Sequence, residues 1–171
     1  MHLPGPLQKL IPSAEAHGNF LRSSWDRLAR LPGGKLVFSR LVGQAAPYTG
    51  TIGAVVTELR PGYARVRLAD RRSVRNHLRC VHAIALANLA ELTGNAALAY
   101  SLPDDARFIV AGMSIEYVKK ARGVITAECD CPVPTSSERR EYAVPVSMKN
   151  AAGEEVARAT LRSLVGPKRA V

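Results

Sequence analysis

The sequence predicts an α+β fold in which a mostly antiparallel sheet encloses one long helix. The first observation behind this prediction is a stretch rich in Ala and Leu, residues 83–100, whose composition strongly favours a helix. Glu91 is its only charged residue, and a helix that is apolar almost all round has to be buried. The second observation is that segments typical of β-strands lie on both sides of this helix, two before it and three or four after it.

The first part of the chain, residues 1–47, is predicted to be a helical lead-in that packs on the main domain. Ser13 can cap a helix, and apolar residues recur at helical spacing over residues 20–31, where a Pro-Gly-Gly turn ends the pattern. A second short helix is expected over residues 35–45, and Pro47 ends it. The apolar stripe could also lie on a membrane, but its polar face is not dominated by Lys and Arg, so packing on the domain is favoured.

The remaining residues, 48–171, are expected to form the main domain, which makes one structural unit with the lead-in. Residues 51–59 and 63–68 predict two strands, and the Arg-Pro-Gly sequence between them indicates a hairpin. Later strands are predicted at residues 108–119, 124–131, 141–148 and 154–165.

The composition predicts a soluble protein with one sizeable core, because 47% of its 171 residues are hydrophobic. No apolar run approaches the roughly 18 residues that cross a bilayer, and the N-terminus lacks a signal-peptide pattern, so we expect a cytoplasmic protein. The three cysteines, Cys80, Cys129 and Cys131, lack the spacing of a zinc site and are expected to be reduced and packed. The sequence implies no metal.

The chain is strongly basic, with a formal net charge of +10. Such a balance is compatible with nucleic acid, anionic membranes or phosphate-bearing ligands as partners. No basic stripe interleaved with aromatic residues accompanies the charge, so a nucleic-acid partner is not expected. One small cluster consists of Lys119, Lys120 and Arg122.

The segment from residue 76 to residue 91 carries a more specific pattern. Asn76 is followed by His82 six residues later, and Glu91 stands nine residues after His82. This spacing resembles thioesterases of the phenylacetate-pathway and 4-hydroxybenzoyl-CoA type, which belong to the hotdog superfamily. In those proteins an Asn, a His and then an Asp or Glu on the helix stand at the same intervals, and two glycines follow the His.

A second match to the same superfamily lies at residues 113–123, where a strand ends in an aromatic residue and an Ala-Arg-Gly sequence follows. The resemblance covers about residues 50–165, and the helical lead-in is similar to an uncharacterised thioesterase-like branch of the superfamily. It implies the hotdog fold, in which a curved antiparallel sheet wraps around one central helix. It also implies a homodimer or a dimer of dimers.

The resemblance implies hydrolysis of an acyl-CoA or a related acyl thioester. Glu91 would act as general base or nucleophile, a role that suits a carboxylate at the edge of an apolar site. The backbone N–H groups of Ala83 and Ile84, at the start of the helix, would stabilise the oxyanion. Asn76 and His82 would position the water, the thioester or the loop.

Four further residues are expected to bind substrate. Ser114 lies on the strand after the helix, near the position where some thioesterases carry a Ser or Thr beside the carboxylate. Lys119, Lys120 and Arg122 would hold the phosphates of CoA, although a solvated strand end would show the same pattern. CoA enters only as part of the substrate, and no cofactor is implied.

Each catalytic assignment has a structural alternative. Asn76 could serve only as a turn residue, His82 could be structural, and Glu91 could form an ion pair with an arginine from a strand. Ala83 and Ile84 also replace the two glycines of the family pattern, and glycines allow a ligand to approach the backbone closely. The alternative function is therefore a hotdog protein that binds an acyl group or acyl-CoA without catalysis.

Overall fold

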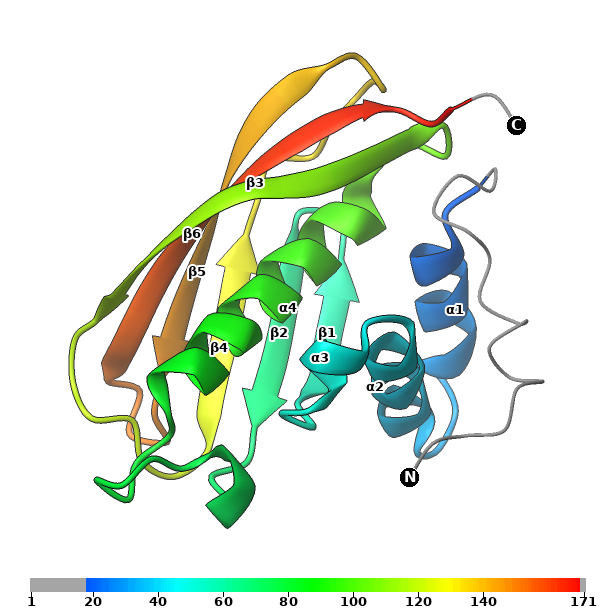
Figure 1. Cartoon of the computed structure of the whole chain (residues 1–171). Helices are drawn as coiled ribbons and strands as arrows, with labels where there is room; N and C mark the ends of the chain where they lie inside the picture. The colour runs from blue at the N-terminus through cyan, green and yellow to red at the C-terminus, as the bar shows by residue number, and fades with distance from the viewer. Residues whose placement is uncertain (1–17, 170–171) are drawn as a thin grey trace.

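A computed structural model describes residues 18–169, which form a six-stranded sheet curved around a central helix, α4 (Ala83–Ser101) (Figure 1). The strand order is β1-β2-β4-β5-β6-β3, and all neighbouring strands are antiparallel. The strands are β1 (Val55–Arg60), β2 (Tyr63–Leu68), β3 (Ala106–Tyr117), β4 (Ile125–Asp130), β5 (Arg140–Lys149) and β6 (Glu155–Pro167). The predicted α+β architecture is confirmed.

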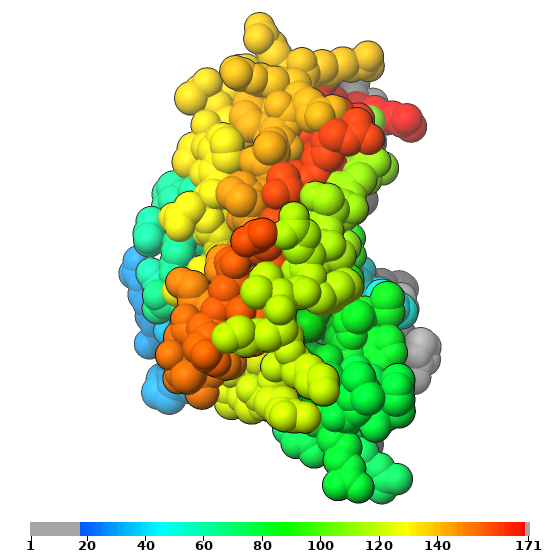
Figure 2. All heavy atoms as spheres, turned by 90° about the vertical axis from the view of Figure 1, so that its left-hand side faces the viewer, coloured from blue at the N-terminus to red at the C-terminus, as the bar shows by residue number. Residues whose placement is uncertain are grey.

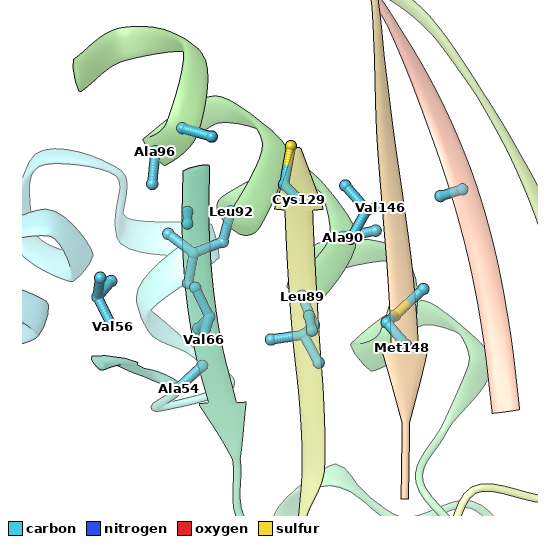
Figure 3. Packing of buried hydrophobic residues seen from close by; sticks show 14 of the residues in the cluster. Ala54, Val56, Val66, Leu89, Ala90, Leu92, Ala96, Cys129, Val146 and Met148 are labelled. Carbon is cyan, nitrogen blue, oxygen red and sulfur yellow. The ribbon is translucent and has the colours of Figure 1, made fainter. Parts of the chain in front are cut away.

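The central helix α4 is buried along most of its length because almost all of its surface is apolar. Leu89 and Ala90 point toward the inner face of the sheet and lie among Val66, Val146 and Met148 (Figure 3). The helix ends at Ser101, two residues before a proline that disfavours a further helical turn. Within residues 18–169, no helix is both long and apolar enough to cross a membrane.

The start of the sheet differs from the prediction. The strand expected from Thr51 begins only at Val55, because Pro47 opens a short helix, α3 (Pro47–Gly50), where the sequence was expected to end the helical part. Proline suits the first position of a helix, where its missing N–H would have no partner. Gly53 then turns the chain into β1 with a φ of +56°, a conformation that favours glycine.

The N-terminal helices pack against α4 and the sheet. They are α1 (Phe20–Leu28) and α2 (Gly34–Ala45), and the ring of Trp25 packs edge-on against that of Phe38 with centroids 5.0 Å apart. Asn19 donates from Nδ2 to Ala99 O over 2.7 Å, so the start of α1 satisfies a carbonyl near the end of α4. The first 17 residues, including the predicted cap at Ser13, lie outside the described residues.

The two edges of the sheet differ in what lies beside them. α2 covers the β1 edge, where Ser39 Oγ accepts the Val56 N–H over 2.9 Å and Lys35 Nζ donates to Thr57 O over 2.7 Å. These contacts satisfy backbone groups that an edge strand would otherwise leave unpaired. At the opposite edge, β3 has no further strand beside it among the described residues.

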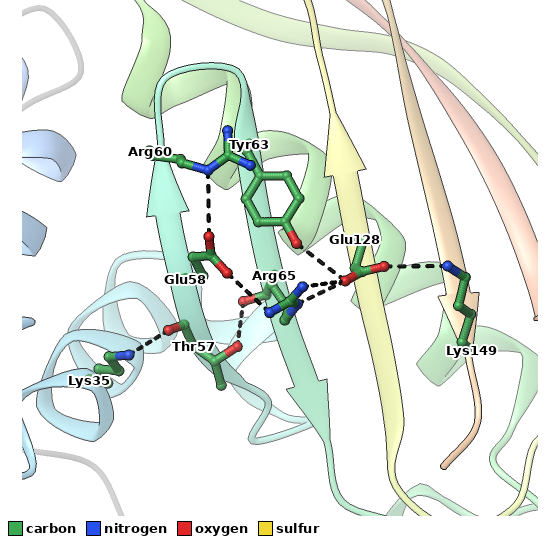
Figure 4. A network of polar contacts seen from close by, with 8 residues as sticks. All are labelled: Lys35, Thr57, Glu58, Arg60, Tyr63, Arg65, Glu128 and Lys149. Carbon is green, nitrogen blue, oxygen red and sulfur yellow. Dashed lines mark hydrogen bonds and ion pairs between the residues drawn. The ribbon is translucent and has the colours of Figure 1, made fainter. Parts of the chain in front are cut away.

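The outer face of the sheet carries a network of charged side chains (Figure 4). Arg65 bridges Glu58 and Glu128 at 3.1 Å and 2.8 Å, and Lys149 lies 3.5 Å from Glu128. Burial opposes ionisation of Glu128, but Arg65, Tyr63 and Lys149 together outweigh it and lower the pKa of its carboxyl. The outer face is thus a polar surface, whereas the inner face forms the core.

Candidate functional site

One face of α4 is less buried than the rest of the helix. We call it the α4 strip, and it consists of Ile84, Ala87, Glu91 and Asn95. Intervals of three and four residues place these side chains above one another on one side of a helix. Glu91 therefore lies in the middle of the least buried face of α4.

The two flanks of the strip are formed by different parts of the chain. On one flank, Asn88 donates from Nδ2 to Tyr48 O of α3 over 3.1 Å. On the other flank lies the inner face of β3, where Met113, Ile115 and Tyr117 stand opposite inward-facing residues of β6. The helix α4 itself runs between the N-terminal helices and β3 (Figure 1).

Tyr117 connects the two sequence patterns that resemble thioesterases. Its hydroxyl donates to Ala83 O, at the first residue of α4, over 3.1 Å, and burial raises the pKa of this phenol. The segment that leads into α4 lies next to the segment that follows β3 (Figure 2), and Val81 N donates to Ala121 O over 2.9 Å. Residues about 35 positions apart are thereby brought together at the start of the helix.

Glu91 is half-buried and has no hydrogen bond or ion pair with any residue of the described chain. The ion pair with a strand arginine that the sequence also allowed does not form within residues 18–169. Along the helix axis, Glu91 lies about 12 Å from Ala83. Tyr117 contacts Ala83, and Met113 lies about 13 Å back along β3 from Tyr117. Met113 and Glu91 are therefore at a similar distance from the start of α4.

The start of α4 is capped by His82. Its Nδ1 accepts the Ile84 N–H over 3.0 Å, so this nitrogen carries no proton and Nε2 is the ring's remaining donor. Of the two expected oxyanion donors, Ile84 is already bonded to the cap, while the Ala83 N–H has no acceptor among residues 18–169. The Ala85 N–H is likewise free within the described part. The sequence did not indicate Ala85 as a donor. His is not among the usual N-cap residues, so the bond from Ile84 to His82, which leaves the Ala85 N–H free, was not expected.

Asn76 organises the loop before the helix. Its Oδ1 accepts the N–H groups of Leu78 and Cys80 over 2.9 Å and 3.3 Å, and its own N–H donates to Cys80 O over 2.9 Å. Arg79 completes the loop with a φ of +55°. The bonds to the side-chain oxygen of Asn76 are therefore those of a turn residue, as the structural alternative predicted. Its Nδ2 has no partner among the described residues and can donate to a ligand.

Asp70 holds together the two loops at this end of the molecule. Its Oδ1 accepts from Arg75 Nε over 2.6 Å and its Oδ2 accepts the Gly123 N–H over 2.9 Å, and its side chain is only 8% exposed. The hydrogen bond from Arg75 holds the pKa of this carboxyl below its ordinary value. Sequence reasoning did not single out Asp70, because its partner Gly123 is 53 residues away.

The predicted cationic cluster is divided in the structure. Lys119 Nζ forms an ion pair with Glu154 at 3.0 Å. Lys120 and Arg122 are exposed on either side of the buried Ala121. Neither forms a hydrogen bond or a close ion pair within residues 18–169, although the charge of Arg122 helps to lower the pKa of Asp70. These two cations therefore remain available to an anionic ligand near the start of α4.

The expected position of Ser114 is corrected by the structure. Ser114 stands opposite Thr160 on the outer face of the sheet, away from α4. Strict alternation from Val110 would have placed it inward, but a β-bulge between Val110 and Gly112 shifts the pattern by one residue. Met113 consequently occupies the inner face, and Ser114 does not belong to the α4 strip.

Comparison with solved structures supports the same architecture. A structural-genomics protein is 34% identical with a TM-score of 0.75, over 86% of this chain and 99% of that one. A Pseudomonas aeruginosa protein of unknown function, named "Probable Thioesterase", is 24% identical with a TM-score of 0.69, over 80% and 97%. A thioesterase from Haemophilus influenzae is 11% identical with a TM-score of 0.66, over 77% and 92%. The last two likenesses are evidence for the fold alone.

No curated protein matches this chain. A family model described as a domain of unknown function, DUF4442, matches residues 34–165, which span the second N-terminal helix, the central helix and nearly all of the sheet. The chain therefore belongs to the DUF4442 family, and it has the hotdog fold.

Proposed function

We propose that this protein hydrolyses an acyl thioester, with acyl-CoA as the substrate class. The observation that carries the proposal is the carboxylate of Glu91, which has no partner in the described chain and lies on the exposed strip of an otherwise apolar helix. A carboxylate without a hydrogen bond or ion pair is free to take a proton or to attack a carbonyl. The thioesterase names of the structural neighbours support the same reaction class.

The proposed reaction uses groups at the first turns of α4. Glu91 takes a proton from water as the water oxygen adds to the thioester carbonyl, and returns it to the thiolate when the C–S bond breaks. Alternatively, Glu91 attacks the carbonyl itself. Glu91 lies about 12 Å along the helix from Ala83, so the free N–H groups of Ala83 and Ala85 would stabilise the oxyanion from the second subunit of the proposed dimer, whereas Ile84 would first have to leave its cap. Asn76 would orient the carbonyl through Nδ2, and His82 holds the helix start.

The exposed cations Lys120 and Arg122 suit binding of the CoA part of the substrate. Lys120 and Arg122 are exposed, form no hydrogen bond or close ion pair among the described residues, and lie on the loop bonded to the segment that leads into α4. Arginine and lysine bind phosphate groups as forks and point charges. We assign to them the phosphates of CoA, with Lys119 contributing only when it leaves Glu154.

Release of free thiol from a panel of acyl-CoAs tests this function. Wild-type protein should release thiol from at least one member, and Glu91→Gln should lower kcat by about 10²- to 10⁴-fold. Glu138→Gln is the matched control, because Glu138 is an exposed loop residue without a partner in the described chain. If the Glu91 and Glu138 variants behave alike, the role of Glu91 is wrong.

A second candidate is binding of an acyl-CoA without hydrolysis. The side chain of Ile84 is 54% exposed at the position where the family pattern has glycine. Its bulk stands where a substrate would approach the helix start. Thermal stabilisation by an acyl-CoA together with no thiol release across the panel would favour this function.

The active protein would be a homodimer. α2 covers the β1 edge, while no further strand lies beside β3 among residues 18–169 and the α4 strip is only partly buried. Pairing of two β3 strands would complete the sheet and bring two α4 strips together. Light scattering should give a mass of twice 18.4 kDa, and a dimer of dimers would double it again. A monomer at all concentrations would refute this assembly.

The expected cytoplasmic location stays a prediction.

A further inference from the structure

We infer that the N-terminal helices form one side of the acyl-binding site and that Tyr48 sets the size of the acyl group accepted there. This inference rests on the proposed function and goes beyond it, because it assigns selectivity to a part of the chain that precedes the sheet. It begins from the contact between α3 and α4. Asn88 donates from Nδ2 to Tyr48 O over 3.1 Å.

This contact places α3 next to the proposed reacting carboxylate. Asn88 and Glu91 are three residues apart on one helix, so their Cβ atoms are about 5–6 Å apart. Asn88 is buried, and its Oδ1 has no hydrogen-bond partner in the described chain. An acyl group that reacts at Glu91 and extends toward Asn88 would therefore meet α3 within a few carbon atoms.

α3 is held firmly in this position. A Cβ atom on Gly50 would lie 2.6 Å from Gly43 O, so the backbones of α2 and α3 are in direct contact. α2 is anchored in turn by the buried ring of Phe38 and by the bond from Val56 N to Ser39 Oγ. A side that is fixed in this way can discriminate by size, because it cannot move aside for a larger group.

Tyr48 is the large exposed side chain of α3. It is 67% exposed, and the other three residues of the helix are Pro47, Thr49 and Gly50. A tyrosine offers an apolar ring with a polar end, which suits contact with an acyl chain near solvent. Its backbone is bonded beside the α4 strip, so the volume of its side chain limits the space available on that flank.

Substitution at Tyr48 in the full-length protein tests the inference. Hydrolysis of acetyl-, butyryl-, octanoyl- and palmitoyl-CoA is measured for the wild type, Tyr48→Ala and Tyr48→Trp. Tyr48→Ala should raise kcat/KM for the longest accepted chain relative to the shortest by about tenfold or more, and Tyr48→Trp should lower that ratio. Leu31→Ala is the matched control, because Leu31 is 57% exposed in the turn between α1 and α2. It should leave the ratio unchanged.

The outcomes separate this inference from the proposed function. If the wild type hydrolyses acyl-CoAs but both Tyr48 variants keep its chain-length profile, the inference is wrong and the function stands. If the wild type hydrolyses none, thermal shifts with non-hydrolysable acyl-CoA thioethers of the same lengths replace the rates. A chain-length order that Tyr48→Ala changes would then support the inference without catalysis. An unchanged order, or no binding at all, would overturn it.

Discussion

Replacing Asp70 by Ala should loosen the connection between the two loops at the start of α4. The substitution removes the acceptor of the Gly123 N–H, bonded over 2.9 Å, and the partner of Arg75. The ion pair with Arg75 adds a smaller amount, because the arginine side chain is 42% exposed and solvent screens the pair. Loss of the bond from Gly123 should cost about 1–2 kcal/mol of unfolding free energy. At this chain length, that corresponds to a fall in Tm of about 2–8 °C.

The effect should depend on pH in a defined direction. The pKa of Asp70 is lowered in the folded protein, chiefly by the hydrogen bond from Arg75. A lowered folded pKa means that the carboxylate stabilises the protein above its unfolded pKa of about 3.9. This stabilisation is lost as the pH falls through the still lower folded value. The difference in Tm between wild type and Asp70→Asn should therefore be largest near neutral pH and shrink below pH ~4.

Thermal unfolding of the wild type, Asp70→Ala and Asp70→Asn over a pH series measures both effects. Asp130→Asn serves as the control, because Asp130 is exposed at the end of β4 and its side chain makes no hydrogen bond or ion pair among residues 18–169. A Tm for Asp70→Ala equal to that of the control at neutral pH would refute the proposal that Asp70 holds the two loops together. A difference that grows on acidification would refute the assigned direction of the pKa shift.

Two further predictions concern the helices. Trp25→Ala removes a buried ring whose centroid lies 5.0 Å from that of Phe38, and it should lower the unfolding free energy by about 3–5 kcal/mol. Urea titrations measure this loss. A loss below about 1 kcal/mol would show that this pair does not anchor the N-terminal helices. His82→Ala removes the cap on the Ile84 N–H and should lower thermal stability by about 1 kcal/mol. His82→Asn should restore most of that loss, and equal Tm values for the two His82 variants would contradict the capping role.

Much of the fold could be predicted from the sequence because burial leaves a local pattern. Residues 83–100 are apolar almost all round, which requires a buried helix, and α4 runs from Ala83 to Ser101. Alternation of polar and apolar residues predicted β2 at its observed bounds. The resemblance at residues 76–91 also predicted the hotdog fold. The start of β1 was misplaced, since the residues after Pro47 form α3 before the chain becomes extended.

The candidate site was less predictable, because its parts meet only through contacts between distant segments. Ser114 was expected to bind substrate, near the position of Val110, but the β-bulge after Val110 turns it to the outer face, and a bulge depends on pairing with β6. Asp70 acquires its role from Gly123, far along the chain. The occupied N–H of Ile84 likewise depends on the ring orientation of His82.

The sequence by itself determined the class of fold and the one charged residue of the central helix. Hydrophobic periodicity and composition are local properties, and they decide which segments become helices or strands and which must be buried. Only the tertiary structure decided what surrounds Glu91, with α3 on one flank and the inner face of β3 on the other. Neighbours in space are set by the register of the strands and the packing of helices, which no stretch of sequence encodes alone.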